Sequence, residues 1–377
     1  MANIIIIGPA HPLRGGLASF DERLARQFQH EGHEVTIYTF SLQYPGFMFP
    51  GTTQYSSEPA PADIRIYVCI NSVNPFNWLK VGNKLKKLRP DLIVVRYWLP
   101  VMGPCLGTIL RRAKKNHHTK VVCIADNIIP HEKRPGDTPF TKYFIKPVDA
   151  FVTMSEKVMA DLRTLDRVKP AQQVSHPLYD NFGEAISTTS ARDWLHIGAD
   201  KKVMLFFGFI RKYKGLDILL DAVAIIKQKN LLQNFTLLVA GEFYEDAQPY
   251  LEQVKNLDIA DVVDLRTNFI PDSEVKYFLC AADAVLQPYR NATQSGVTPL
   301  AYHFEIPMVV TNVGGLPSMV PDGKVGLVAE PNANAIAEKI AAYFALGKES
   351  FLQALKEEKK KYLWHHLTNA IMDLVKL

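Results

Sequence analysis

Short β-branched runs that alternate with helical stretches constrain the fold of this sequence most. The runs are apolar, are bounded by Gly, Pro or Asp, and alternate with stretches of helical periodicity. This order is typical of parallel strands joined by crossover helices. Six runs in each half predict two doubly wound α/β sheets rather than one. The predicted strands are 3–8, 34–39, 64–70, 91–96, 120–125, 150–154, 203–208, 235–241, 262–265, 283–287, 308–311 and 326–328.

The length and composition agree with two folded domains. The chain has 377 residues, of which 47% are hydrophobic and only 21% charged, which excludes disordered and fibrous classes. Residues 169–200 hold Pro170, Pro177, Gly183 and Gly198 with weak periodicity, so we expect a linker near residue 185. The expected domains are 1–185 and 186–364. A terminal helix at about 365–377 could pack back on the first domain.

The cysteines and apolar runs bear on the location of the protein. Cys69, Cys105, Cys123 and Cys280 lie far apart, without a CxxC pair or a zinc-type cluster, which indicates reduced thiols. The longest apolar runs fall far short of the roughly 20 residues of a membrane span. The first residues lack the basic start of a secretory signal. We therefore expect a cytoplasmic protein, at most located at the inner face of a membrane.

Ligands of open parallel sheets bind beyond the carboxyl ends of the strands, so residues that follow strands are the first candidates. Gly15 and Gly16 follow the first strand and precede a helix at 17–30. Backbone N–H groups and the helix dipole at such a turn suit a phosphate, although a plain tight turn explains the pair equally well. The dinucleotide fingerprint GxGxxG is absent here.

Two segments of the second half suit a diphosphate. The loop after strand 203–208 carries Gly208, Arg211 and Lys214, and Arg and Lys both bind phosphate oxygens. A solvated basic loop is the alternative. Small residues at 294–297 then follow strand 283–287 and precede a helix, which frees backbone donors for a second anion contact.

The ordered set of these motifs resembles family 4 of the retaining glycosyltransferases. Each motif is weak alone, but their order and spacing run along nearly the whole chain. The resemblance rests on Pro12 with Gly15-Gly16, residues 32–35, Gly208 with Lys214-Gly215, residues 293–301, residues 307–315, Asp322-Gly323 and Gly326.

The resemblance implies the B-type glycosyltransferase fold, in which two Rossmann-like domains face each other across a cleft. It implies a nucleotide-sugar donor of UDP or GDP type held mostly by the C-terminal domain and an acceptor held by the N-terminal domain. It also implies that no cofactor or metal is required, and the sequence contains no metal-binding DxD triplet. The implied reaction is retaining, front-face transfer of a hexosyl or related group, in which the leaving diphosphate helps to remove the acceptor proton.

The resemblance also assigns donor-binding residues. Lys214 matches the phosphate-binding lysine of the family, and Arg211 could replace the usual arginine, whose position is Phe209 here. Three family glutamates are missing, because their positions hold Ala292, Leu300 and Ser318. The expected donor-binding residues are Gly15, Gly16, Gly208, Arg211, Lys214, Gln294, Ser295, Gly296 and Val297.

In the N-terminal domain, residues 124–132 follow a strand and resemble the strand-end histidine segment of the family. Asp126 occupies the position where histidine is common, and His131 lies nearby. Asp126, Asn127 and His131 are therefore the expected catalytic residues, which would orient the acceptor hydroxyl or the transferred sugar. A structural hydrogen-bonding role for His131 is the alternative.

Arg96, Tyr97 and Trp98 end another strand of this domain and could stack on an acceptor sugar, or simply pack beneath a loop. Residues 1–190 carry 23 Lys and Arg against 16 Asp and Glu, whereas residues 191–377 carry 20 against 22. The excess suits an anionic partner such as a phosphorylated substrate or a lipid surface, but an ordinary solvated face explains it as well. The cations on two predicted helices are Lys84, Lys86, Lys87, Arg89, Arg111, Arg112, Lys114 and Lys115.

The sequence leads us to expect a glycosyltransferase of cell-surface polysaccharide or glycolipid synthesis. Its partners would be a nucleotide sugar and a glycan or lipid-linked acceptor, with no nucleic acid. Two alternatives stay open. The missing glutamates suit a non-catalytic protein that binds nucleotide sugars or glycans, and the same fold also suits a nucleotide-sugar epimerase.

Overall fold

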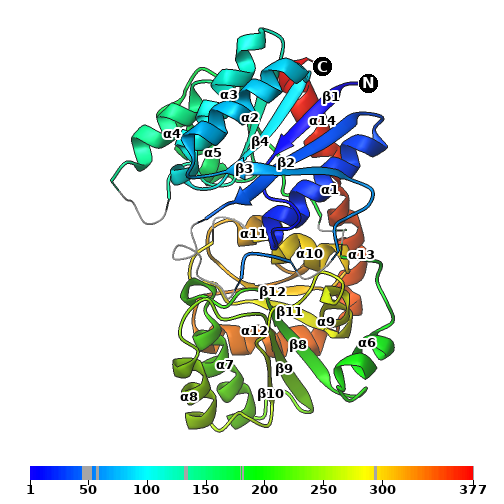
Figure 1. The fold of residues 1–377 in the computed structure, drawn as a ribbon. Helices are drawn as coiled ribbons and strands as arrows, with labels where there is room; N and C mark the ends of the chain where they lie inside the picture. The colour runs from blue at the N-terminus through cyan, green and yellow to red at the C-terminus, as the bar shows by residue number, and fades with distance from the viewer. Residues whose placement is uncertain are drawn as a thin grey trace. The chain divides into compact units, whose positions relative to one another are not determined.

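The computed structural model describes residues 1–44, 53–56, 59–130, 135–178, 180, 182–292 and 295–376. The chain forms two compact units (Figure 1). Unit 1 comprises Met1–Pro177 with Leu363–Leu377, and unit 2 comprises Leu178–Tyr362. The sequence analysis expects the two boundaries between these units near residue 185 and after residue 364.

Unit 1 is built on a parallel sheet of seven strands in the order β3-β2-β1-β4-β5-β6-β7. The central strand β1 pairs with β2 on one side and with β4 on the other, so that Ile5 lies beside both Thr36 and Ile93. Its strands are β1 (Asn3–Ile7), β2 (Glu34–Leu42), β3 (Arg65–Asn71), β4 (Leu92–Tyr97), β5 (Lys120–Ala125), β6 (Ala150–Thr153) and β7 (Ala171–Gln173).

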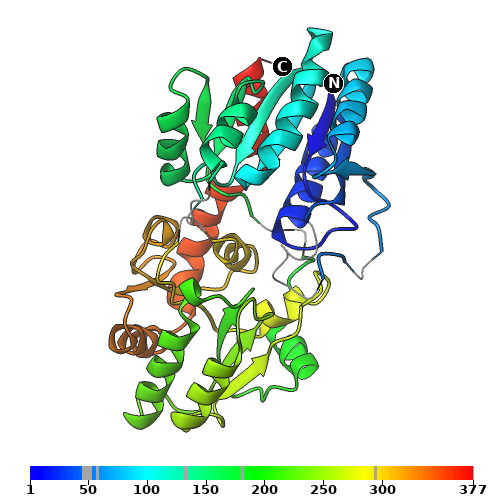
Figure 2. The ribbon, with the colours of Figure 1, turned by 60° about the vertical axis from the view of Figure 1, so that its left-hand side comes forward.

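Helices cover both faces of this sheet, as Figure 2 shows, which explains why β1 and β4 are apolar along nearly their whole length. One face packs against α2 to α5, whose buried side chains share a core with Ile5 and Ile7. Helices α1 and α14 contact each other elsewhere in the same unit. The helices of unit 1 are α1 (Gly16–His30), α2 (Pro75–Leu88), α3 (Gly103–Ala113), α4 (Asp137–Ile145), α5 (Glu156–Leu165) and α14 (Trp364–Val375).

Unit 2 contains a second parallel sheet, of six strands, in the order β10-β9-β8-β11-β12-β13. Its strands are β8 (Lys202–Phe207), β9 (Phe235–Ala240), β10 (Val263–Arg266), β11 (Ala284–Gln287), β12 (Met308–Thr311) and β13 (Gly326–Ala329). Its helices are α6 (Thr188–Leu195), α7 (Leu216–Gln228), α8 (Gln248–Asn256), α9 (Val275–Ala281), α10 (Val297–His303), α11 (Leu316–Met319), α12 (Ala333–Leu346) and α13 (Glu349–Lys359).

The C-terminal segment is divided between the units. Helix α13 belongs to unit 2, and α14 begins at Trp364 in unit 1. The ring of Trp364 lies 4.8 Å from that of Phe20 in α1, and the Arg23 guanidinium lies 5.0 Å from the Trp364 ring. Figure 1 shows the red α14 beside the blue α1. The last helix thus completes the domain that the first residues begin.

The predicted two-sheet α/β architecture is confirmed, and every predicted strand is present to within a few residues. The sequence analysis missed β7, a three-residue edge strand of composition Ala-Gln-Gln. Its polar residues give no strand signal, because an edge strand of this length buries little. No helix in the described residues is long and apolar enough to cross a bilayer.

Candidate functional site

Three predicted donor-binding residues meet at the carboxyl end of β8. Gly208 follows the strand with a φ of +91°, a conformation that favours glycine. A Cβ added at Gly208 would lie 3.1 Å from Lys214 Nζ and 3.7 Å from Val297 Cγ2. The absence of a side chain at Gly208 therefore leaves room for the ammonium group of Lys214. Lys214 itself lies in a short 3₁₀ turn, Lys212–Lys214.

Lys214 is a buried cation without a counter-charge. Its side chain is only 8% exposed, and among the residues that the structure describes its ammonium group makes no hydrogen bond or ion pair. Burial, with a smaller contribution from Arg211, lowers the pKa of Lys214 to about 7. An anion at this position would offset the desolvation of the ammonium group, which makes the site receptive to phosphate.

Tyr289 joins this cluster, although the sequence analysis did not name it. Its hydroxyl lies 3.3 Å from Ser295 Oγ, which in turn accepts a hydrogen bond of 3.2 Å from the Val297 N–H. The Lys214 Nζ lies 5.9 Å from the centre of the Tyr289 ring. Tyr289 follows β11 by two residues, and that position at a strand end is the signal that could have identified it.

Two glycines hold the loop that carries Tyr289. A Cβ at Gly215 would lie 2.1 Å from the Pro288 carbonyl oxygen, and one at Gly314 would lie 1.6 Å from the Ala292 carbonyl oxygen. Both glycines have positive φ, so backbone approaches backbone where no other residue fits. The predicted residue Gln294 lies outside the described residues. Gly296 precedes α10 in an ordinary helical conformation.

Arg211 is exposed, and its guanidinium carbon lies 5.1 Å from the centre of the Tyr244 ring. Phe209, at the position of the usual family arginine, stacks on the same ring at 4.1 Å. Phe209 therefore makes an aromatic contact at the position where the family has an arginine. Arg211 is the nearby cation, and it contacts the same tyrosine ring.

The residues at the three positions where the family has glutamates are either buried or bonded to the backbone. Ala292 and Leu300 are buried, and the Ser318 hydroxyl donates to the Gly315 carbonyl oxygen at 2.8 Å. Across the described part of the chain, no group of three or more His, Cys, Asp or Glu side chains is placed to hold a metal ion.

In unit 1, Gly15 and Gly16 form the turn at the start of α1. Gly15 has a φ of +102°, and a side chain there would meet no atom within 4 Å. Its carbonyl oxygen accepts from the Ala18 and Ser19 N–H groups. Among the described residues, no atom fills the space that a Gly15 side chain would take, which leaves room for a ligand at this helix N-terminus.

Arg96 and Asp126, predicted as an acceptor residue and a catalytic residue, bind each other. Arg96 Nε donates to Asp126 Oδ2 at 2.6 Å, and Arg96 Nη2 donates to Asp126 Oδ1 at 2.7 Å. Both side chains are buried. The guanidinium lies 3.8 Å from the centre of the Phe20 ring. This bidentate pair ties the ends of β4 and β5 together and occupies both carboxylate oxygens of Asp126.

Asp21 completes this cluster, and the sequence analysis did not identify it. Its Oδ1 lies 3.3 Å from Arg96 Nη1, whereas its buried Oδ2 has no hydrogen-bond partner among the described residues. Burial, reinforced by the nearby Asp126 carboxylate, outweighs the attraction of Arg96 and raises the pKa of Asp21 to about 8. A protonated Asp21 leaves one carboxylate for one guanidinium, so the cluster is neutral at pH 7. A polar residue on the buried face of α1 is the signal that could have pointed to it.

The other predicted residues of unit 1 have different surroundings. Tyr97 is completely buried, stacks on Phe144 at 4.1 Å and is hydrogen-bonded to Thr141. Trp98 is 5% exposed and donates to the Tyr44 hydroxyl. Both rings therefore pack in the core, the alternative that the sequence left open, and show no free face to a sugar. Asn127 is half-buried, and His131 lies outside the described residues.

Two family models match the chain over nearly all of its length. The model for glycosyltransferase family 4 covers residues 14–175, and the model for glycosyl transferases group 1 covers residues 188–362. The chain belongs to this family of glycosyltransferases. Each model lies almost entirely within one unit, so the family assignment covers both sheets.

Several curated relatives are named D-inositol 3-phosphate glycosyltransferase. The protein of Corynebacterium efficiens is 26% identical over 64% of this chain, and that of Thermobifida fusca is 26% identical over 84% of this chain and 77% of its own length. A putative colanic acid biosynthesis glycosyltransferase of Escherichia coli, WcaL, is 28% identical over 39% of this chain and 37% of its own length. The chain spans only 59% of the length of the Corynebacterium efficiens protein and 56% of the length of the D-inositol 3-phosphate glycosyltransferase of Saccharomonospora viridis.

Solved structures share the whole fold at low sequence identity. Sucrose-phosphate synthase of Thermosynechococcus elongatus matches with a TM-score of 0.74 and 17% identity, over 100% of this chain and 98% of that one. HepE of Anabaena, solved with UDP and glucose, matches over 100% of both chains with a TM-score of 0.73 and 15% identity. These likenesses show the B-type glycosyltransferase fold.

Proposed function

We propose that the protein is a retaining glycosyltransferase that moves a hexosyl or related group from a UDP- or GDP-type nucleotide sugar to a glycan or lipid-linked acceptor. The observation that carries the proposal is the buried ammonium of Lys214 beside Gly208 and Val297, which has no partner among the residues that the structure describes. The naming of HepE with UDP-glucose, together with the family, supports a nucleotide sugar as the anion that pairs with Lys214.

The chemistry follows from the charge that develops on the leaving diphosphate. Lys214 and the backbone N–H groups of Ser295 and Gly296 would stabilise that charge, which is commonly the largest electrostatic contribution in such a site. No protein nucleophile is needed when the diphosphate itself accepts the acceptor proton. The acceptor would bind at the carboxyl edge of the unit 1 sheet, near Gly15 and Asn127.

The proposal includes neither a cofactor nor a metal ion, so transfer should proceed at an unchanged rate in EDTA. We place the reaction in the cytoplasm, because all four cysteines are free thiols, which fits a reducing compartment. A role in polysaccharide or glycolipid synthesis agrees with the name of WcaL and with the solved structure of WaaG, a glycosyltransferase described as involved in lipopolysaccharide biosynthesis and 17% identical to this chain.

The deciding experiment measures UDP and GDP affinity as a function of pH. Because the pKa of Lys214 is about 7 in the free protein, binding above pH 7 must take up a proton. We expect the Kd of the favoured nucleotide to rise about tenfold per pH unit above 7. In Lys214→Met the Kd should be higher throughout and nearly independent of pH. Lys212→Met, an exposed neighbour, is the matched control. A pH-independent Kd in the unaltered protein would contradict the assignment.

Turnover separates the alternatives. A donor that is consumed only when an acceptor is added supports a transferase. Consumption without acceptor, with isomerisation of the sugar, would indicate an epimerase. Tight nucleotide binding without consumption across a panel of donors and acceptors would favour the non-catalytic homologue.

A further inference from the structure

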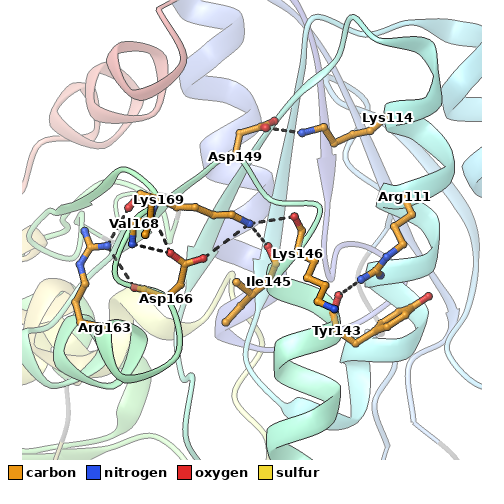
Figure 3. A network of polar contacts seen from close by, with 10 residues as sticks. All are labelled: Arg111, Lys114, Tyr143, Ile145, Lys146, Asp149, Arg163, Asp166, Val168 and Lys169. Atoms are coloured by element: carbon orange, nitrogen blue, oxygen red, sulfur yellow. Dashed lines mark hydrogen bonds and ion pairs between the residues drawn. The ribbon is translucent and has the colours of Figure 1, made fainter.

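The buried ammonium group of Lys214 is not fixed by bonds of its own. Lys169 of unit 1 shows the usual arrangement, because its Nζ donates to the Ile145 carbonyl oxygen at 2.6 Å and to the Lys146 carbonyl oxygen at 3.0 Å (Figure 3). Lys214 makes no such bond among the described residues. Its position must therefore be set by the backbone turn that carries it.

The turn Lys212–Lys214 has little support of its own. The Lys214 N–H donates to the Arg211 carbonyl oxygen at 2.8 Å, and the Gly215 N–H donates to the Lys212 carbonyl oxygen at 3.1 Å. Arg211 precedes the turn with an extended backbone, and its side chain does not cap the first N–H groups. A single 3₁₀ turn leaves those groups without partners inside the turn. Other segments of unit 2 must supply them.

Two loops that follow the neighbouring strands supply this support. The turn follows β8, and the sheet places β9 on one side of β8 and β11 on the other. After β9, Glu245 Oε2 accepts a hydrogen bond of 2.9 Å from the Lys212 N–H. After β11, the Arg290 N–H donates to the Tyr213 carbonyl oxygen at 2.7 Å. The bond from Arg290 is made by its main chain, so Glu245 supplies the side-chain cap that the turn itself lacks.

A second hydrogen bond fixes the Glu245 carboxylate. Its Oε1 accepts from the hydroxyl of Tyr250 in α8. Tyr250 is only 7% exposed, belongs to the core of unit 2 and lies against Phe243, with the ring centres 5.5 Å apart. Both carboxylate oxygens are thus bonded, and hydrogen bonds to a charged group are among the stronger ones. Glu245 therefore connects the turn to the core.

Glu245 supports Lys214 through the backbone and not through its charge. Burial and the nearby Arg211 lower the pKa of Lys214, and among the described residues no carboxylate is close enough to oppose them. The carboxylate that bonds the Lys212 N–H thus leaves the ammonium group of Lys214 without a counter-charge. This arrangement keeps the cation available to an anionic ligand.

We propose that Glu245 is a positioning residue of the nucleotide site. Its carboxylate caps the turn Lys212–Lys214 and so holds the Lys214 ammonium beside Gly208, where a diphosphate would pair with it. The inference rests on the proposed function, because it assigns a role within the same site. A turn that is already in place loses less conformational entropy when the ligand binds. Without the cap, the turn opens and the ammonium group moves into water.

The test compares UDP and GDP affinities of Glu245→Ala and the unaltered protein from pH 7 to 9, by calorimetry. We expect the Kd of the favoured nucleotide to be about tenfold higher in Glu245→Ala at pH 7, as for the loss of a hydrogen bond to a charged group. The rise of about tenfold per pH unit should disappear, because a lysine in water stays protonated over this range.

The tyrosines around the turn do not titrate in this range. Burial raises the pKa of Tyr213, Tyr250 and Tyr289 above the ordinary value of 10.0. The other charged groups near the turn are Lys212 within it, Arg211 before it, and Arg290, which pairs with Asp217 of α7. A change in the pH dependence between pH 7 and 9 can therefore be assigned to Lys214.

Two matched variants separate the cap from the charge of the carboxylate. Glu245→Gln keeps an oxygen that can accept from the Lys212 N–H, and its amide can bond to Tyr250. It should restore most of the affinity and the full pH dependence. Asp246→Ala removes the adjacent carboxylate, whose bond of 3.0 Å to the Gln248 N–H stays within its own loop. Its Kd should equal that of the unaltered protein throughout.

A measurement without nucleotide separates the cap from the proposed function. The chemical shift of Lys214 Cε, assigned by comparison with Lys214→Met, reports the protonation of the amine directly. The midpoint should lie near pH 7 in the unaltered protein and in Glu245→Gln, and above pH 9 in Glu245→Ala. If these midpoints are found but no nucleotide binds, the cap is supported and the proposed function is contradicted.

Three outcomes would contradict the role of Glu245. An unchanged Kd and an unchanged midpoint in Glu245→Ala would show that the turn is stable without a cap. A higher Kd that still rises about tenfold per pH unit would show that the ammonium group stays buried and that the loss arises elsewhere. An equal loss in Glu245→Gln and Glu245→Ala would show that the charge of the carboxylate matters and its position does not.

Discussion

At the scale of single residues, the two units each bury a charge-bearing side chain in an unfavourable state. Lys214 lacks a counter-charge among the described residues, and Asp21 has a carboxylate oxygen without a hydrogen bond. Such groups lower the stability of the fold and are retained where function needs them. The loss of stability caused by Lys214 decreases as the pH rises, whereas the loss caused by Asp21 increases.

Replacing Lys214 by Met should stabilise the protein below neutral pH. The folded pKa of about 7 lies below the ordinary value of 10.5, so the penalty is full below pH 7 and disappears as the pH approaches 10.5. The gain in unfolding free energy should thus shrink with rising pH, by about 1.4 kcal/mol for each unit of pKa displacement. Denaturant unfolding of Lys214→Met and the exposed control Lys212→Met, from pH 6 to 10, measures this. An equal, pH-independent effect in both variants would contradict it.

Asp21→Asn should have the reverse dependence. A pKa raised to about 8 means that folding keeps a proton on Asp21, and the stability that this provides below pH 4 is lost as the pH rises to 8. The variant cannot titrate, so its stability relative to the unaltered protein should grow between pH 4 and 8. The control is Asp63→Asn, because the Arg26 contact lowers the pKa of Asp63. If the thermal stability of the two variants changed with pH in the same way, the claim that folded Asp21 holds a proton would be wrong.

At the scale of elements, the site of unit 2 depends on loops held by backbone contacts between strand ends. The Gly314 turn after β12 lies against the Ala292 carbonyl, and Gly215 before α7 lies against Pro288. Thr311 adds a hydrogen bond of 2.6 Å to the Tyr289 carbonyl oxygen. Close backbone approach fixes these loops without using side chains that a ligand would need.

Gly314→Ala should move the loop that carries Ala292 and weaken nucleotide binding. The added methyl group would lie 1.6 Å from the Ala292 oxygen, and the positive φ adds a backbone cost. We expect a stability loss of more than about 1 kcal/mol together with a higher Kd for UDP. Gly347→Ala is the control that separates the steric clash from the backbone cost. Gly347 has a φ of +80°, but no described atom lies within 4 Å of its added Cβ. Equal nucleotide affinities in the two variants would exclude the clash.

The sequence predicted elements better than it predicted side-chain roles. Periodicity located every core strand because burial on both faces leaves a continuous apolar run, whereas the polar edge strand β7 had no such signal. Gly208, Lys214 and Val297 could be grouped because all follow strands of one sheet. The pairing of Arg96 with Asp126 and the core position of Tyr97 could not be predicted, since a residue at a strand end can face ligand or interior. The role of Asp21 could not be predicted either, because its contact with Arg96 joins elements that are distant in sequence.

At the scale of the whole molecule, the chain passes from unit 1 to unit 2 and returns. The first crossing follows Pro177 and the second follows Tyr362. The return brings Trp364 into contact with Phe20 and Arg23, so unit 1 is made of residues from both ends of the described sequence. Its stability therefore depends on the C-terminal helix as well as on its strands.

Trp364→Ala should destabilise unit 1 selectively. Loss of a buried tryptophan costs about 3–5 kcal/mol, and its contacts with Phe20 and Arg23 lie in unit 1. Hydrogen exchange should become faster in α1 and α14 and stay unchanged in β8 and β9. Leu363→Ala, a neighbouring side chain that is 39% exposed, should change neither. Faster exchange throughout both units would show instead that they unfold together.

The return of α14 sets an order of events during synthesis. Residues 1–177 leave the ribosome first, yet the helix that contacts α1 emerges only after all of Leu178–Tyr362. Unit 2 is continuous and has its full complement of contacts as soon as it is translated. Unit 1 is thus completed only after unit 2 has been translated, and until then Phe20 lacks its contact with Trp364.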